Sequence, residues 1–485
     1  MPSLRPHRMG VVSSQNRELQ ISKPDAQNRL RHAGDNQPDT NCDREGDMRK
    51  KGSFTGKAEL RGASINQHPM DRRRLLLAGG ALSGALAGNV LVPQISSAEG
   101  ASNLPPNVPA WMKEQGAPIL SAPYGVPSRF EKNIVRRKRE ERPTDTAATS
   151  FAPLQDLHGI ITPNGLCFER HHGGVPDINP EEHRLVVHGM VDRELIFTMD
   201  GLARFPSVSR IHFLECSGNT LNWKSANPKW TVQFTHGLLM CCEWTGVPLS
   251  TLLDEVGVKP GAKWILAEGA DAAAMSRSVP LSKALDDALI VYAQNGERLR
   301  PEQGYPARLL VPGFEGNMNV KWLRRLKVGD QPFETREETS KYTDLMPDGT
   351  ARQFTFLMEA KSVITHPSGG QQLKGGPGFY EISGLAWSGH GRIRRVDVST
   401  DGGRNWREAQ LQQPILSKAL TRFRASWQWD GSPALLQSRA MDETGYVQPR
   451  HDAIVNARGV NSFYHYNAIQ TWRVDINGEV SIHVA

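Results

Sequence analysis

The chain has 485 residues, enough for two or three domains that each bury a core. Its formal net charge is +7, but residues 1–98 hold 15 Lys and Arg against 9 Asp and Glu, which leaves 43 against 42 in the rest. This nearly balanced remainder excludes the broad basic surface of a nucleic-acid-binding protein. The five cysteines, two of them adjacent, are a poor basis for a disulfide framework.

The N-terminal residues predict two segments outside the folded protein. Residues 1–69 are polar, with few aromatic or β-branched residues, so we expect a disordered extension or a start codon assigned in error. Residues 70–98 contain three arginines at 72–74, then leucines and a Gly-rich apolar run, then small residues. This order predicts a signal peptide, and the paired arginines before leucines resemble a twin-arginine export signal. The alternative is a buried N-terminal helix.

The signal-like segment also predicts where the protein works. Its apolar run is too short for a secure membrane span, so we expect a periplasmic protein whose mature chain does not cross a membrane. The resemblance to twin-arginine signals implies export in the folded state, often with a cofactor already inserted, which suits a metal enzyme.

The next part of the chain predicts an arm and then a catalytic core. Residues 99–150 are rich in Pro and Ser and predict a linker or arm, with a charge run at 136–142 that favours a solvated arm or a surface helix. From about Phe151 to residue 350, short apolar strands alternate with helical patterns. The clearest strands are expected at 184–189, 263–267 and 307–311, and an amphipathic helix with Pro near its start at 248–256.

Residues 351–485 have the pattern of a β-sandwich of the immunoglobulin-like kind. Val396, Val398 and Thr400 alternate with polar residues before Asp401 and Gly402, a pair that favours a hairpin. Three tryptophans and further short strands follow, and no cysteine pair is available to bridge two sheets.

Cys216 is the first candidate functional residue. It follows Phe213, Leu214 and Glu215 and precedes the turn residues Ser217–Asn219, so a strand is expected to end at a glycine-containing turn. A thiolate at such a turn can enter a cleft and bind a soft or high-valent metal. By itself the signal is weak, because an isolated cysteine is more often a small buried hydrophobic residue.

Two further segments carry candidate ligand-binding residues. His171 and His172 suggest zinc, but adjacent side chains seldom point the same way and no third ligand has the spacing of a zinc motif. Glycines within 304–322 allow the backbone to approach a ligand closely. In the same segment, Arg308 and Lys321 can bind a phosphate.

Together these segments resemble the sulfite oxidase family of molybdopterin enzymes, over about residues 150–485. The resemblance implies an α+β chain, with a mixed α/β molybdopterin domain at 151–350 and an immunoglobulin-like dimerisation domain at 351–485. It also implies a molybdenum–molybdopterin cofactor and a two-electron oxidation of a sulfur substrate.

The resemblance implies residue roles as well. Cys216 matches the molybdenum ligand, Arg170 the substrate-side arginine and Tyr342 the active-site tyrosine, so these three are the catalytic candidates. Asp271 falls where the family has a pterin-binding acid. The full set of cofactor-binding candidates is Phe168, His172, Cys216, Asp271, Gln303, Arg308, Asn317 and Lys321.

Departures from the sulfite-oxidising members bear on the substrate. Residues 220–222 are Thr-Leu-Asn where those relatives often carry an arginine, and Gln303 stands where many have histidine. With the runs at 315–333 and 336–344, these features look most like the molybdenum subunit of sulfane dehydrogenase (SoxC-like), from the Sox thiosulfate-oxidation system. The implied substrate is a sulfane sulfur on a carrier-protein cysteine. The alternative is a sulfite:cytochrome c oxidoreductase that acts on free sulfite, and a sulfoxide reductase is less favoured.

Electrons must leave such a site one at a time. The chain has no C-x-x-C-H motif, and His366, which resembles a cytochrome b5 haem ligand, opens the β-rich region, so we expect no haem here. We therefore expect a separate c-type, dihaem cytochrome subunit and a homodimer of this chain within a hetero-oligomer. An interpretation of another class is a non-catalytic exported β-sandwich binding protein, which metal analysis of the mature protein would distinguish.

Overall fold

The computed structural model describes residues 112, 115, 117–138, 144–220, 227, 229–460 and 463–483. The expected extension at 1–69 and export signal at 70–98 lie outside the described residues, as do residues 221 and 222. Contacts within the chain separate residues 1–115 from residues 116–485, and every described strand belongs to the second unit. Among the described residues, no helix is both long and apolar enough to cross a membrane.

One sheet of the first domain has the strand order β5-β4-β13-β8-β9, with β4 and β13 parallel and the other neighbours antiparallel. Its strands are β4 (Leu185–Gly189), β5 (Leu195–Phe197), β8 (Trp264–Gly269), β9 (Ser276–Pro280) and β13 (Leu323–Gly329). The strands predicted at 184–189 and 263–267 are therefore confirmed.

Helix α3 (Leu249–Val256) covers this core as the sequence predicts. Pro248 precedes its first residue, where the missing N–H of proline costs no hydrogen bond, and Gly257 ends it with a positive φ of 69°. Apolar residues recur at the spacing of one helix face, and all are buried: Leu249, Leu252, Leu253 and Val256.

A second sheet of the domain has the order β11-β10-β7-β6, and β12 also pairs with β10. β6 and β7 are antiparallel over eight residue pairs, from Val208 opposite Gly246 to Glu215 opposite Leu239. The long β6 thus ends next to Cys216, as the sequence predicts. The strands are β6 (Val208–Glu215), β7 (Leu239–Pro248), β10 (Leu289–Gln294), β11 (Glu297–Arg298) and β12 (Arg308–Leu310).

Part of the segment expected to be an arm pairs with the domain instead. Two short strands, β1 (Arg137–Lys138) and β2 (Thr149–Phe151), form a three-stranded sheet with β3 (Glu169–Arg170). The described part of the charge run therefore ends in an edge strand rather than a helix, because Arg137 and Lys138 pair with β2. The side chains of Arg136 and Lys138 have carboxylate partners. The remaining elements are α1 (Met199–Ala203), α2 (Val232–His236), α4 (Leu281–Asp286), α5 (Arg336–Thr339), β14 (Asp344–Leu345) and β15 (Ala351–Arg352).

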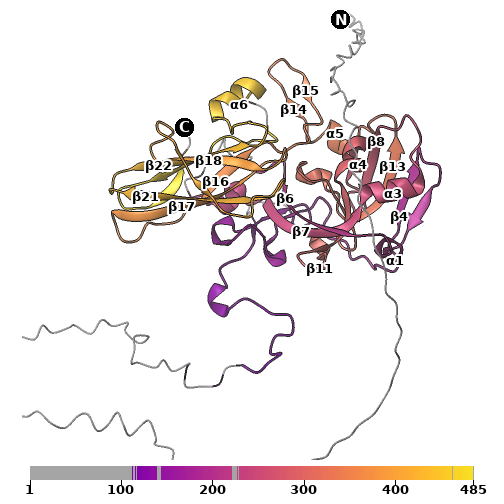
Figure 1. Ribbon diagram of the computed structural model, residues 1–485, viewed down its shortest axis with the longest axis horizontal. Helices are drawn as coiled ribbons and strands as arrows, with labels where there is room; N and C mark the ends of the chain where they lie inside the picture. The colour runs from indigo at the N-terminus through magenta and orange to yellow at the C-terminus, as the bar shows by residue number, and fades with distance from the viewer. Residues whose placement is uncertain are drawn as a thin grey trace, which may run out of the picture. The chain divides into compact units, whose positions relative to one another are not determined.

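The C-terminal part is the predicted β-sandwich, drawn in orange to yellow in Figure 1. One sheet has the order β16-β17-β21-β20 and the other β19-β18-β22-β23-β24. Helix α6 (His451–Arg458) lies between β22 and β23 in the chain. The strands are β16 (Lys361–His366), β17 (Gly378–Trp387), β18 (Ile393–Ser399), β19 (Arg407–Glu408), β20 (Gln410–Leu411), β21 (Thr421–Trp429), β22 (Ala434–Asp442), β23 (Thr471–Val474) and β24 (Val480–His483).

The hairpin predicted at Asp401 is present, with a longer loop than a two-residue turn. β18 ends at Ser399 and pairs with β19, which begins at Arg407. The Asp401 carboxylate accepts hydrogen bonds from the backbone N–H groups of Arg404 and Asn405, which closes the loop. These bonds, led by that from Asn405, lower the pKa of Asp401 to about 2.

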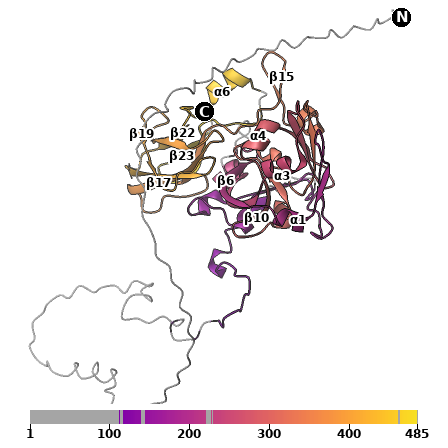
Figure 2. The same ribbon diagram turned by 45° about the vertical axis from the view of Figure 1, so that its right-hand side comes forward.

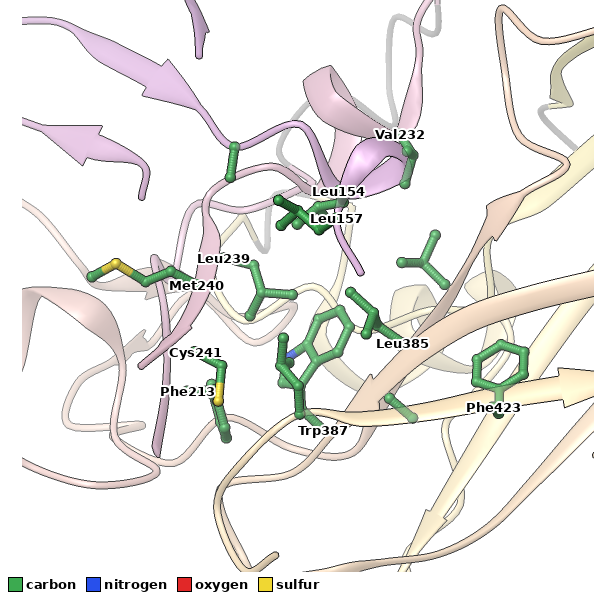
Figure 3. Packing of buried hydrophobic residues seen from close by; sticks show 14 of the residues in the cluster. Leu154, Leu157, Phe213, Val232, Leu239, Met240, Cys241, Leu385, Trp387 and Phe423 are labelled. Atoms are coloured by element: carbon green, nitrogen blue, oxygen red, sulfur yellow. The ribbon is translucent and has the colours of Figure 1, made fainter. Parts of the chain in front are cut away.

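The two domains share one hydrophobic core. Buried side chains from β6 and β7 pack against the inner side of the sandwich, and Phe213, Cys241 and Trp387 come together there in Figure 3. Both ribbon views place β6 on the side of its domain that faces the sandwich (Figure 1, Figure 2). A separate core fills the space around α3, β4, β8 and β13. The sandwich therefore packs against β6, the strand that ends next to Cys216.

This shared core predicts cooperative unfolding. Leu239→Ala truncates a fully buried side chain of β7 within the shared core. We expect the free energy of unfolding to fall by about 2–5 kcal/mol in one transition rather than two. The measurement is denaturant unfolding followed by tryptophan fluorescence and far-ultraviolet circular dichroism. Ile196→Ala, which truncates a side chain that is 64% exposed, serves as the control and should change the value by less than about 0.5 kcal/mol. Two separate transitions in the Leu239 variant would contradict the shared core.

Candidate active site

Cys216 follows the last residue of β6 and begins a tight turn. Its backbone N–H donates to Leu238 O at 3.0 Å, and its carbonyl accepts from Asn219 N at 2.8 Å. Gly316 comes so close that a Cβ built on it would lie 3.1 Å from the Cα of Cys216, so a side chain would force this loop apart. Burial raises the pKa of the Cys216 thiol, and Arg170 is among the groups that oppose this rise.

One cavity brings together all ten candidate residues. It lies where β3, β12 and the loops after β6 and β8 converge, and Cys216 forms part of its wall. The sequence did not single out four other residues that line it, Met240, Met275, Asn319 and Trp322. The predicted residues in the lining are Phe168, Arg170, His172, Cys216, Asp271, Gln303, Arg308, Asn317, Lys321 and Tyr342.

Arg308 is buried and Lys321 is half-buried, and neither cation has a carboxylate partner in the described residues. Arg308 donates to Gln303 O at 2.9 Å and Asn319 O at 3.1 Å, and its Nε has no partner there. The Lys321 ammonium donates to Arg170 O at 3.2 Å and Glu302 O at 3.0 Å. Burial lowers the pKa of Arg308 to about 10 and, together with the Arg308 charge, lowers that of Lys321 well below its usual range. Such a pair suits an anion that brings the missing negative charge.

His172 and Tyr342 meet in the wall of the cavity that Cys216 also lines. The His172 Nε2 lies 3.1 Å from the Tyr342 hydroxyl. Burial, followed by the positive charges of Arg170 and Lys341, lowers the pKa of His172 to about 3, so this imidazole is neutral at neutral pH. Tyr342 adopts the left-handed region at φ 57°, which is unfavourable for a non-glycine residue unless its surroundings fix it. Burial raises the pKa of the Tyr342 hydroxyl, so this group stays protonated and can donate a hydrogen bond.

The two adjacent histidines have different partners. His171 Nε2 lies 2.8 Å from the Glu169 carboxylate, and its Nδ1 lies 2.9 Å from the Lys321 ammonium. The imidazoles therefore do not converge on one point, and no group of three His, Cys, Asp or Glu side chains within the described ranges is arranged to hold a metal ion. His366 is the exposed last residue of β16 and lies in the sandwich.

A second cavity opens on the other side of Cys216. It shares Arg170, His172, Cys216 and Tyr342 with the first, so these four residues stand between the two. Four of the nine other residues in its wall are aromatic, and one of these, Phe463, is 41% exposed. The further lining residues are Thr149, Phe151, Gly218, Thr220, Phe234, Leu238, Lys341, Phe463 and Tyr464. Sequence reasoning missed this wall, because its C-terminal members have no local motif.

A buried polar network supports the cavity floor. The Asn317 amide donates to Ser217 Oγ at 3.1 Å and Glu315 Oε2 at 2.6 Å, and Arg277 lies 3.2 Å from Glu315 Oε1. Burial alone would raise the pKa of Glu315, but Arg277 and His465 lower it to about 2. The network fixes Asn317 against the turn that follows Cys216. Its only local signal was Glu315, an acid inside a glycine-rich apolar run.

Comparison with known proteins gives two matching family models. Residues 172–337 match the oxidoreductase molybdopterin binding domain, and residues 352–472 match the Mo-co oxidoreductase dimerisation domain. The two matches cover the first domain and the sandwich, respectively.

Individual relatives give the same result. The chain is 30% identical to the sulfite oxidase of Gallus gallus over 430 residues, covering 82% of this chain and 91% of that one. It is 31% identical to the mitochondrial sulfite oxidase of Drosophila melanogaster over 330 residues, 62% of this chain, and spans 57% of that protein's length. Among solved structures, the sulfane dehydrogenase SoxCD from Paracoccus pantotrophus matches with 50% identity and a TM-score of 0.76, covering 78% of this chain and 98% of that one.

The uncompensated cations predict that the protein without its ligand binds inorganic phosphate. Phosphate should raise the unfolding temperature of protein produced without cofactor, because a ligand that binds the folded state stabilises it by mass action. Lys321→Met should reduce this response, since one of the two cations is gone. Differential scanning fluorimetry over a phosphate series at constant ionic strength measures it, with the exposed Lys374→Met as the matched control. An equal phosphate response in the Lys321 variant and the wild type would contradict the assignment.

Proposed function

This chain belongs to the sulfite oxidase family of molybdopterin oxidoreductases, and on that premise we propose that it oxidises a sulfane sulfur carried on a cysteine of another protein. The family makes it an oxidoreductase that acts on sulfur groups. The proposal depends mainly on the 50% identity to a sulfane dehydrogenase over 98% of that chain. The aromatic second cavity at Cys216 supports it independently.

The residues of the first cavity fit a molybdenum–molybdopterin cofactor. A thiol suits the metal, and two cations without counter-charge suit the phosphate of the pterin. The unpartnered Nε of Arg308 leaves a donor free for such a ligand. Cys216 would hold the metal and Arg308 and Lys321 the phosphate. The pterin would lie against Phe168, His172, Asp271, Gln303 and Asn317.

When bound, the cofactor supplies a two-electron oxygen-atom transfer to the substrate's sulfur. The chain's own residues bind and orient the substrate. Arg170, which lines both cavities, binds the negative charge that develops on the oxidised sulfur group. The Tyr342 hydroxyl, held beside the neutral His172, donates a hydrogen bond to an oxygen at the same place. The buried aromatic side chains around them exclude water.

The second cavity fits a sulfane sulfur on the cysteine of a carrier protein better than a small free anion. Its cations are Arg170 and Lys341, and the rest of its wall is mostly aromatic or apolar. Residues 220–222 are Thr-Leu-Asn, where sulfite-oxidising members of the family often carry an arginine. A carrier protein recovers affinity through contacts outside the cavity, so it needs fewer cations inside. Oxidation of free sulfite, the activity named for the Gallus gallus relative, is the alternative.

The electron acceptor and the location are part of the same proposal. The chain has no C-x-x-C-H motif to attach a c-type haem, so single electrons pass to a separate c-type cytochrome subunit. The matching dimerisation domain supports a homodimer of this chain within that complex. The twin-arginine pattern at 70–98 supports export to the periplasm.

Cys216→Ser should abolish turnover while the fold and the bound pterin remain. A hard hydroxyl replaces the thiolate, whereas the pterin is held by other residues. Activity with an added electron acceptor, pterin content and unfolding temperature are measured together. Cys241→Ala, at another buried cysteine that lies outside both cavities, is the control and should keep its activity. Activity of the serine variant within about tenfold of wild type would rule out Cys216 as the ligand.

The substrate is tested by comparing kcat/KM for a persulfidated carrier protein with that for free sulfite, using the same cytochrome. We expect the carrier to be preferred, because each missing charge-assisted bond to sulfite costs about ten- to hundredfold in binding. Phe463→Ala, at the exposed edge of the second cavity, should lower kcat/KM for the carrier more than for sulfite. If sulfite is the better substrate by about tenfold or more, the alternative function takes its place.

A further inference from the structure

The turn that carries Cys216 is held by the C-terminal domain as well as by its own. On the sandwich side, the Lys361 ammonium lies 2.8 Å from Glu215 Oε1, and Trp387 Nε1 donates to Glu215 Oε2 at 2.6 Å. The backbone N–H of His465 donates to Ser217 O at 2.9 Å. The Thr220 hydroxyl donates to a backbone carbonyl of the same domain, 2.9 Å away. Lys361 also donates to the Thr220 hydroxyl at 3.3 Å, so five bonds join the second domain to one short turn.

Strand geometry explains why Glu215 and Cys216 face different partners. Neighbouring side chains in an extended strand point to opposite faces. Leu214 and Cys216 line the cofactor cavity, whereas Phe213 and Glu215 face the sandwich. Only one peptide unit separates Glu215 from Cys216, so a carboxylate held on one face of the chain limits where the sulfur on the other face can point.

The Glu215–Lys361 pair is one of the most deeply buried ion pairs in the described structure. Glu215 is 0% exposed and Lys361 is 1% exposed. Burying two charges costs desolvation free energy, and an apolar pair of the same size is often as stable. General stability therefore does not explain this pair.

The fixed orientation of the Glu215 carboxylate explains the pair better. Glu215 Oε1 accepts from Lys361 and from the Asn219 amide at 3.0 Å, while Oε2 accepts from the Trp387 indole. Three donors in fixed places hold the carboxylate, and hence the end of β6, in one orientation. An apolar side chain packs without such a preference.

We propose that Glu215 is a positioning residue for the Cys216 thiolate, held in place by Lys361 and Trp387 of the C-terminal domain. Through the Glu215–Lys361 pair, the C-terminal domain would fix the direction in which the Cys216 sulfur points toward the bound metal. The inference rests on the proposed role of Cys216 as the metal ligand. The thiolate direction governs its overlap with the metal, so the pair affects the electronic state of the bound metal and the rate of oxidation more than substrate binding.

The test uses the full-length, cofactor-loaded protein with the variants Glu215→Gln, Lys361→Met and the double variant. Glutamine keeps one acceptor oxygen and replaces the other by an NH2 group, so in either orientation Trp387, or Lys361 and Asn219, faces a donor and the turn must shift. We expect kcat to fall about tenfold or more with KM within about twofold, and the electron paramagnetic resonance signal of one-electron-reduced molybdenum to change. Molybdenum content should stay near that of the wild type.

The double variant separates positioning from stability. It leaves no unpaired buried charge, so its unfolding temperature should recover while the altered resonance signal and low kcat remain. Asp287→Asn is the matched control, because Asp287 pairs with Lys418 across the same domain boundary at 2.5 Å without touching the turn. A double variant with a wild-type signal and kcat would overturn the proposal, as would an equal change in the Asp287 variant. If Cys216→Ser alters the signal and the Glu215 variants do not, the ligand assignment stands and the positioning role falls.

Discussion

The pairing of β6 with β7 is the constraint on which the rest of the structure depends. Eight residue pairs fix the register, so the strand ends with Glu215 on one face and Cys216 next to it on the other. A shift of one residue would exchange these faces and place a carboxylate in the cavity that Cys216 lines. The shared core on the sandwich side makes such a shift unfavourable, because Phe213 would leave its buried position (Figure 3).

The charges of the cavity follow from a second constraint, which is that two cations stand in its wall without a carboxylate partner in the described residues. Arg308 and Lys321 bond mainly to backbone carbonyls, which fixes their positions without neutralising them. The Glu315 carboxylate, by contrast, has a cationic partner within the protein, Arg277, and His465 lies 3.3 Å from its other oxygen. The structure thus separates a region prepared for an anion from one that only supports the turn after Cys216.

Much of this arrangement could be predicted from the sequence, because its determinants are local. Helix α3 followed from apolar spacing between Pro248 and Gly257, and all ten candidate residues line one cavity. The partners of Glu215 could not be predicted, since Lys361 is 146 residues away and no pattern marks it. The aromatic wall was missed for the same reason: Phe463 and Tyr464 reach the cavity only after the whole sandwich has folded. The strands β1 and β2 were missed because two or three residues carry too little periodicity.

The shared core also has an evolutionary consequence. Domains joined by a polar linker can be exchanged by recombination, because each keeps its own surface. Here an unrelated C-terminal domain would leave the apolar face of β6 and β7 exposed to water. It would also leave the buried Glu215 carboxylate without the ammonium group of Lys361. A new domain fused at this boundary would therefore need both a matching apolar face and a cationic partner for Glu215. The two matched segments are expected to descend together, as one heritable unit rather than as interchangeable modules.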